Sequence, residues 1–169
     1  VVVGAFDQDD HHGAVYVFER GNSFWVQKAK LVAAEPVTDD WFGFDVAIDG
    51  ELLVVGATRN LGTASPGRAF IFEKAACGDW IERQVLLPPD SPESLSGFGW
   101  SVSIEGGSVV IGRPGRRAVY TFLKSADQSL WEFESMVTAS DSVQGDAFGR
   151  STSLQNGMLV VGAPTSSIL

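Results

Sequence analysis

The feature that most constrains this fold is a dipeptide that returns at a fixed distance from a second glycine. Phe-Gly occurs three times, and 14 residues after each Phe a short run of β-branched residues ends in Gly. The three pairs are Phe42 and Gly56, Phe98 and Gly112, and Phe148 and Gly162, with Val2-Val3-Gly4 as a fourth copy of the second half. Self-similarity at a period of 50 to 56 residues predicts a chain of equivalent structural units.

Two further features recur in each unit, in the same order. An aromatic-rich apolar run follows the glycine, and a Trp follows that run after 7 to 9 residues. These are Trp25, Trp80 and Trp131, for which packing against a neighbouring unit is expected rather than a sugar-stacking role. Together the features predict one run of repeats with boundaries at 1–41 (partial), 42–97, 98–147 and 148–169 (partial).

Each unit predicts four short β-strands. In the second unit they are expected at 44–48, 52–57, 69–73 and 80–86, where Val, Ile, Phe and Tyr dominate between turn-forming residues. Tight turns between the first two strands are expected at Asp49-Gly50, Gly106-Gly107 and Asn156-Gly157, which supply positive φ angles. Applied to the whole chain, the pattern predicts thirteen strands.

The polarity of these strands predicts an all-β fold made of propeller blades. The second and third strands are apolar on both faces, so both faces must be covered, while the fourth mixes in charges that suit an outer edge. A sandwich or barrel is the alternative, but it would show one polar face on most strands. Closed propellers typically have about four to eight blades, so about three blades with partial repeats at each end predict that further blades or another subunit complete a ring.

The motifs resemble the FG-GAP repeat of integrin α-subunit-like propellers. The closest matches are Phe98-Gly99-Trp100-Ser101-Val102-Ser103-Ile104 and Val160-Val161-Gly162-Ala163-Pro164. Kelch repeats are the alternative family, since they share the period, but they need a Gly-Gly in each blade and only Gly106-Gly107 occurs. The FG-GAP resemblance implies a non-catalytic, extracellular or secreted module for adhesion, with a protein or glycan as partner.

Calcium is not carried over with the resemblance. Calcium-binding FG-GAP repeats have an Asp/Asn-rich loop between the first two strands, where this chain has only tight turns. A two-residue turn cannot place six or more oxygen ligands around Ca²⁺. We therefore expect no metal and no cofactor.

Composition argues against several other functions. With 12 basic and 21 acidic residues the net charge is −9, which opposes nucleic-acid binding and attachment to anionic membranes. No apolar run is long enough to insert into a membrane. The two histidines are adjacent and no nucleophile motif is present, so no catalytic residue is predicted; a pair of carboxylates of the glycosidase kind is the remaining enzymatic alternative.

Candidate ligand-binding residues lie in the long connections. In an antiparallel blade, the loops between the second and third strands and those between blades emerge on one face, and rigidly held loops are where binding usually occurs. A cation site at 7–12 is the less favoured interpretation of the first loop, because neighbouring loop residues seldom converge on one ion. The candidates are Asp7, Asp9, Asp10, His11, Arg59, Asn60, Asp90 and Asp141. A purely structural role, in which the chain only completes a larger assembly, is the alternative function.

Overall fold

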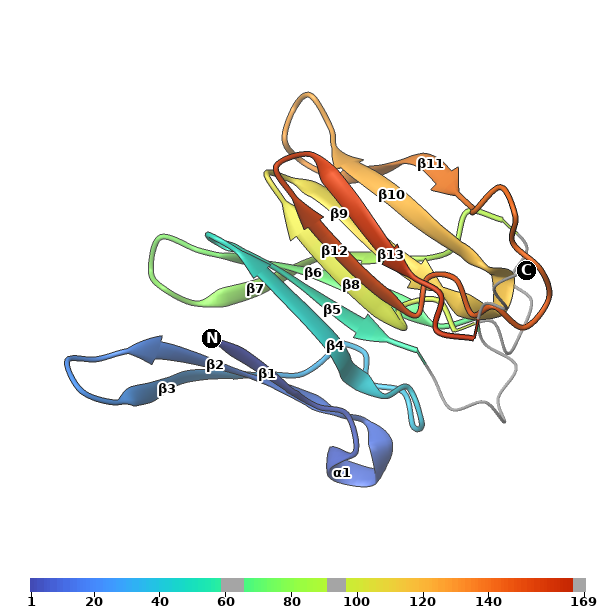
Figure 1. The fold of residues 1–169 in the computed structure, drawn as a ribbon. Helices are drawn as coiled ribbons and strands as arrows, with labels where there is room; N and C mark the ends of the chain where they lie inside the picture. The colour runs from blue at the N-terminus through green and yellow to red at the C-terminus, as the bar shows by residue number, and fades with distance from the viewer. Residues whose placement is uncertain (59–65, 91–96, 166–169) are drawn as a thin grey trace.

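The computed structural model describes residues 1–58, 66–90 and 97–165, and along these ranges it forms thirteen strands in four antiparallel sheets (Figure 1). The first sheet contains β1 (Val2–Ala5), β2 (Ala14–Arg20) and β3 (Trp25–Leu31). The second contains β4 (Phe42–Asp49), β5 (Leu52–Ala57), β6 (Arg68–Lys74) and β7 (Trp80–Leu86). The third contains β8 (Ser101–Glu105), β9 (Ser108–Arg113), β10 (Ala118–Lys124) and β11 (Trp131–Val137), and the fourth contains β12 (Ser151–Gln155) and β13 (Met158–Gly162). The predicted all-β fold of four-stranded blades is confirmed.

Two short helical turns interrupt this pattern. The helical turn α1 (Gln8–His11) connects β1 to β2, and the 3₁₀ turn η1 (Pro114–Arg116) connects β9 to β10. No helix in the described ranges has the length and apolar character needed to span a bilayer.

The middle strands of each blade are buried on both faces, as their composition predicts. In β5 the side chains of Leu53 and Val55 belong to the core between the first and second sheets. Val54, which points to the opposite face, belongs to the core between the second and third sheets. Because alternate residues of a strand face opposite ways, one apolar strand supplies both cores.

The fourth strand lies at the outer edge of each complete blade. The order β4-β5-β6-β7 places β7 at the rim. Along β7, half-buried residues such as Glu82 alternate with exposed ones. Arg83 pairs with Glu73 of β6 at 3.0 Å across this edge. Charges along such an edge deter pairing with another sheet.

Glycines bring consecutive blades into close contact. A methyl group added to Gly56 of β5 would overlap the carbonyl oxygen of Gly99, which belongs to the Phe-Gly of the next blade. The same relation joins Gly4 to Gly43 and Gly112 to Gly149. The two glycines of the sequence repeat are therefore the two sides of one blade-to-blade contact, where any side chain would force the sheets apart.

The first strand of the second blade starts earlier than predicted. It was expected at 44–48 but begins at Phe42, and its register with β5 is irregular between Phe42 and Asp45. A bulge of this kind hides the strand period in the sequence. The predicted positive φ angles are present in the tight turns, for example at Gly50 (56°) and Asn156 (52°).

The three tryptophans behave differently from one another. Trp131 is buried in the core shared with the preceding blade, and its Nε1–H donates to the carbonyl of Gly107 at 2.9 Å. Trp80 is half-buried against the preceding sheet, but Trp25 is 52% exposed. The expectation that all three pack against a neighbour is wrong for Trp25, because no sheet precedes β1–β3 among the described residues.

Candidate ligand-binding face

One side of the molecule carries the connections that lead from β1 to β2, from β9 to β10 and from each sheet to the next. In Figure 1, α1 and the described parts of the inter-sheet connections lie on the same side, away from the hairpins β2–β3, β6–β7 and β10–β11. We call this side the long-loop face, defined by residues 6–13, 32–41, 87–90, 114–117 and 138–147. Six of the eight candidate residues from the sequence fall within it, whereas Arg59 and Asn60 lie outside the described residues.

The first corner of this face gathers carboxylates around one histidine. The Nε2 of His11 lies 2.9 Å from Asp7, and its Nδ1 lies 2.9 Å from Asp39 of the following inter-sheet loop. Asp9 and Asp10 have left-handed φ angles of 53° and 54°, which turn the chain back toward β2. Within the described ranges no group of three or more His, Cys, Asp and Glu is arranged to hold a metal ion. Sequence reasoning placed Asp7 and His11 together but missed Asp39, which is distant in the chain.

Asp90 is held in a network at the third blade. Its carboxylate accepts hydrogen bonds from Arg113, from Arg116 at 3.1 Å and from the hydroxyl of Tyr120 at 2.8 Å. Burial alone raises the pKa of Asp90, but the Tyr120 hydroxyl and the two guanidinium groups outweigh it, so the pKa lies below its ordinary value. Burial, followed by the bond to Asp90, raises the pKa of Tyr120. Because Arg113 is fully buried, Asp90 fastens the inter-sheet loop to the blade that the loop enters.

Other acidic residues of the face serve the loops themselves. Asp40 is buried and pairs with Arg68, while Asp146 accepts a hydrogen bond from the backbone N–H of Val143 at 2.7 Å. Asp146 thus binds a backbone N–H group of its own connection, whereas Asp40 forms an ion pair with the following blade. Asp141 is exposed.

A row of aromatic rings runs from the long-loop face onto the starts of β4 and β8 beside it. Phe6 contacts Trp41 and Phe44, with ring centroids 5.7 and 5.4 Å away. Phe44 then meets Trp100 of the next blade at 4.9 Å, and the guanidinium of Arg150 lies 4.9 Å from the Trp100 ring. We call Phe6, Trp41, Phe44 and Trp100 the aromatic row.

Sequence reasoning missed this row, although a signal was present. Phe44, Trp100 and Arg150 each follow directly after a Phe-Gly, so they occupy equivalent positions on adjacent blades. Phe6 is 38% exposed, and the other three rings are half-buried. The indole N–H of Trp41 has no acceptor among the described residues. Partly exposed aromatic faces suit the binding of a ligand that has apolar surface.

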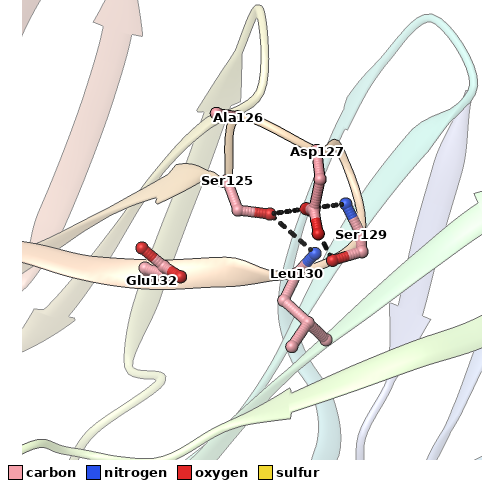
Figure 2. Close-up of a pocket in the computed structure, with 6 residues that line it drawn as sticks. All are labelled: Ser125, Ala126, Asp127, Ser129, Leu130 and Glu132. Carbon is pink, nitrogen blue, oxygen red and sulfur yellow. Dashed lines mark hydrogen bonds between the residues drawn. The ribbon is translucent and has the colours of Figure 1, made fainter.

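Two hollows that are lined by described residues lie outside the row. One, of about 410 Å³, is on the opposite side of the molecule at the β10–β11 turn (Figure 2). There the Asp127 carboxylate accepts hydrogen bonds from the hydroxyls of Ser125 and Ser129 and from the Ser129 N–H, which lower its pKa to about 2. The polar groups are thus engaged in closing the turn.

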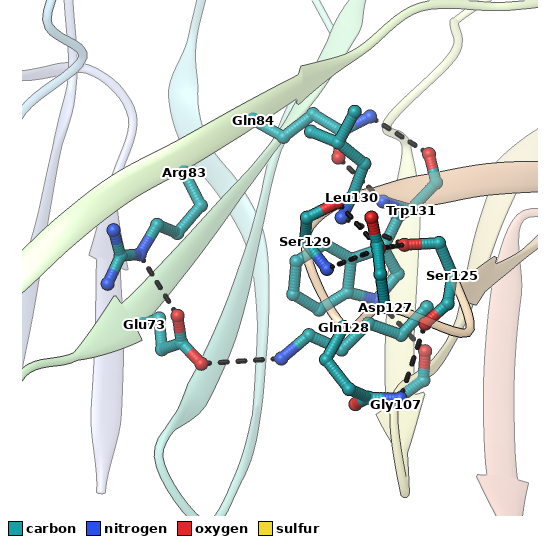
Figure 3. Close-up of polar contacts among 11 residues, drawn as sticks. Glu73, Arg83, Gln84, Gly107, Ser125, Asp127, Gln128, Ser129, Leu130 and Trp131 are labelled. Atoms are coloured by element: carbon teal, nitrogen blue, oxygen red, sulfur yellow. Dashed lines mark hydrogen bonds and ion pairs between the residues drawn. The ribbon is translucent and has the colours of Figure 1, made fainter.

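The surroundings of this turn have a structural role as well. Figure 3 shows Gln84 of the second blade bonded to both the N–H and the carbonyl of Trp131, at 2.7 and 2.9 Å. These bonds join neighbouring blades at their outer rim. The second hollow, of about 190 Å³, is on the long-loop face and is lined by Arg116, Arg117, Thr138, Ala139 and Ser142.

Stacked four-stranded sheets, joined through paired glycines, define a propeller-type repeat protein. The FG-GAP repeat family matches residues 25–72 and 131–168, which together make up half of the chain, and the protein belongs to this family. Each matched stretch begins at the Trp of an outer strand and runs into the next sheet, so the sequence repeat spans two blades. No curated protein matches the chain. FG-GAP repeats are generally non-catalytic and typically serve in binding.

Proposed function

We propose that this chain is a non-catalytic binding module that takes a protein or glycan ligand on its long-loop face, in an adhesive role outside the cell. The observation that carries the proposal is the aromatic row. Phe6, Trp41 and Trp100 come from three separate connections and Phe44 comes from β4, and none of the four rings belongs to the two cores. Tryptophan is the residue most often found to dominate binding energy at interfaces.

The scaffold supports such a role because it holds the face rigidly. Asp90 and Asp40 each fasten an inter-sheet loop to the following blade through a buried or half-buried arginine. Loops fixed in this way lose little conformational entropy when a ligand binds, which favours affinity.

The test is a binding screen against panels of glycans and extracellular proteins, followed by Trp100→Ala. Loss of a central interface tryptophan is expected to weaken binding about tenfold to thirtyfold. Trp25→Ala is the matched control, since Trp25 is 52% exposed and begins β3 on the opposite side. Equal affinity of the wild type and Trp100→Ala, or equal losses in the two variants, would exclude the aromatic row as the binding site.

A second candidate function is supported by the free strand edges. β1 and β13 are each at the edge of an incomplete sheet, with Val3 46% and Val160 61% exposed. Unpaired edges with apolar side chains favour association with further strands. A chain that bound nothing in the screen but assembled with other blades would favour this structural role over the binding module.

A further inference from the structure

The corner between β9 and β10 differs from its two counterparts at two positions. Strand pairing places Arg113 at the position of Ala57, and Arg117 immediately before β10, where Gly67 precedes β6. The first blade has Ala5 and Gly13 at these positions. The third blade therefore replaces a small residue with arginine twice within one loop.

Arg117 adopts a backbone conformation that normally belongs to glycine. The φ angles at this position are 79° for Gly13, 87° for Gly67 and 53° for Arg117. For a residue with a Cβ atom, the left-handed region is sterically unfavourable. A strained residue at the mouth of a cavity is a reason to look for a function that compensates for the strain.

The side chain of Arg117 borders the hollow of about 190 Å³ on the long-loop face. Among the described residues, no carboxylate lies within ion-pair distance of its guanidinium, whereas Arg113 and Arg116 both pair with Asp90. The lining also includes Thr138 and Ser142, and the buried hydroxyl of Ser142 has no hydrogen-bond partner in the described ranges.

The charges around the cavity favour a small anion. Arg116 and Arg117 line it, and none of the described residues that line it is acidic. Asp146 is engaged by the Val143 N–H, and Asp141 is exposed beside Ser142. Since the whole chain carries a net charge of −9, it would repel a polyanion at longer range more strongly than it would repel a single negative charge.

We propose that this cavity binds the carboxylate of a sugar acid. A guanidinium presents a planar pair of donors that match a carboxylate, and the exposed Thr138 can offer its hydroxyl to a hydroxyl of a sugar ring. Its volume is that of about six water molecules in the liquid, which leaves room for a ring beyond the carboxylate. This assignment rests on the proposed function, because it names one chemical group that the long-loop face would recognise.

The test titrates the full chain with D-galacturonate, D-galactose, N-acetylglutamate and sulfate, followed by calorimetry or by NMR shifts. Galacturonate is expected to bind saturably and galactose not to bind. Arg117→Gly restores the residue of the other two corners and should weaken galacturonate binding by at least about tenfold, the usual effect of losing a charged hydrogen bond. Its melting temperature should not fall, because the left-handed strain is relieved. Arg83→Gln, which alters an exposed rim arginine of β7, is the matched control and should bind as the wild type does.

Unchanged galacturonate affinity in Arg117→Gly, or no saturable binding of galacturonate, would overturn the proposal. Equal binding of N-acetylglutamate would overturn the preference for a sugar, and a response to sulfate alone would overturn the preference for a carboxylate. Trp100→Ala separates this proposal from the proposed function. If Trp100→Ala still weakens ligand binding while Arg117→Gly leaves the affinity for galacturonate unchanged, the long-loop face remains the binding site and only the sugar-acid subsite is excluded.

Discussion

Three glycine substitutions can separate steric contact between blades from backbone strain. Gly50→Ala introduces strain only, since φ is 56° and no atom lies within 4 Å of the added methyl. Gly56→Ala introduces contact only, because its φ is not positive but the methyl would overlap the carbonyl of Gly99. Gly99→Ala introduces both, with φ at 85°, overlap with the Arg68 carbonyl and 3.0 Å to the N–H nitrogen of Ala57.

The expected losses of unfolding free energy follow from these geometries. Left-handed strain costs about 1–2 kcal/mol, which is the full expectation for Gly50→Ala. Inserting a methyl against backbone atoms costs about 1–3 kcal/mol, which is the expectation for Gly56→Ala. Gly99→Ala combines the two, so a loss of about 2–5 kcal/mol is expected.

Urea unfolding at 25 °C, followed by tryptophan fluorescence, measures all three. The buried Trp131 reports on the contact between the second and third blades. The reasoning is refuted if Gly99→Ala and Gly50→Ala are equally destabilised, or if Gly56→Ala is as stable as the wild type. Either result would mean that the blades do not meet through their paired glycines.

The remaining predictions concern the core, pH, calcium and assembly. Phe98→Ala should lower the free energy of unfolding, measured in urea, by about 3–5 kcal/mol, because Phe98 is fully buried against Tyr120 and Phe122. Phe148 is only half-buried, so Phe148→Ala should lower it clearly less, and equal losses would contradict this prediction. Burial raises the pKa of Asp45 above its ordinary value of 3.8, despite hydrogen bonds from the N–H groups of Val102 and Val46. The free energy of unfolding of the wild type should therefore fall, relative to that of Asp45→Asn, as pH rises from below 3.8 through the raised pKa. Asp45→Asn should then have the higher melting temperature at pH 7 but not in acid. A difference in melting temperature that stays constant with pH would count against this prediction. Melting curves with excess Ca²⁺ and with chelator should coincide, because the turns between the first two strands of each blade are too short for a calcium loop. A difference of several degrees between the two melting temperatures would reveal a tight calcium site. Light scattering on the isolated 18.1 kDa chain should show oligomers, because β1 and β13 have free edges, and a monomer with a sharp melt would argue against this.

Much of the fold was readable from local sequence patterns. The strands expected at 52–57 and 80–86 have those bounds in the structure, since apolar runs and flanking turn residues mark both ends. The tight turn at 156–157 was predicted because Asn and Gly tolerate positive φ. The early start of β4 was missed, because a bulge breaks the alternation on which the prediction depends.

The candidate site was predicted only as a face. The topology of an antiparallel blade decides which connections share a side, so the long loops could be assigned without coordinates. The partners within that face could not: Asp39 reaches His11 across 28 residues, and Phe44 meets Trp100 across two blades. The first pair has no spacing that a sequence pattern would reveal, and although Phe44 and Trp100 each follow a Phe-Gly, only the structure shows that their rings meet.

The sequence by itself determined the repeating unit, its four strands and the glycines that let one unit lie against the next, because these depend on backbone conformation and residue size within a short stretch. Only the tertiary structure decided what the same motif residue does in each copy. Trp131 is buried because a blade precedes it, and Trp25 is exposed because no blade precedes it among the described residues. Arg113 stands where the repeat has alanine, and its charge is tolerated in a buried position because Asp90 arrives from a separate loop to pair with it.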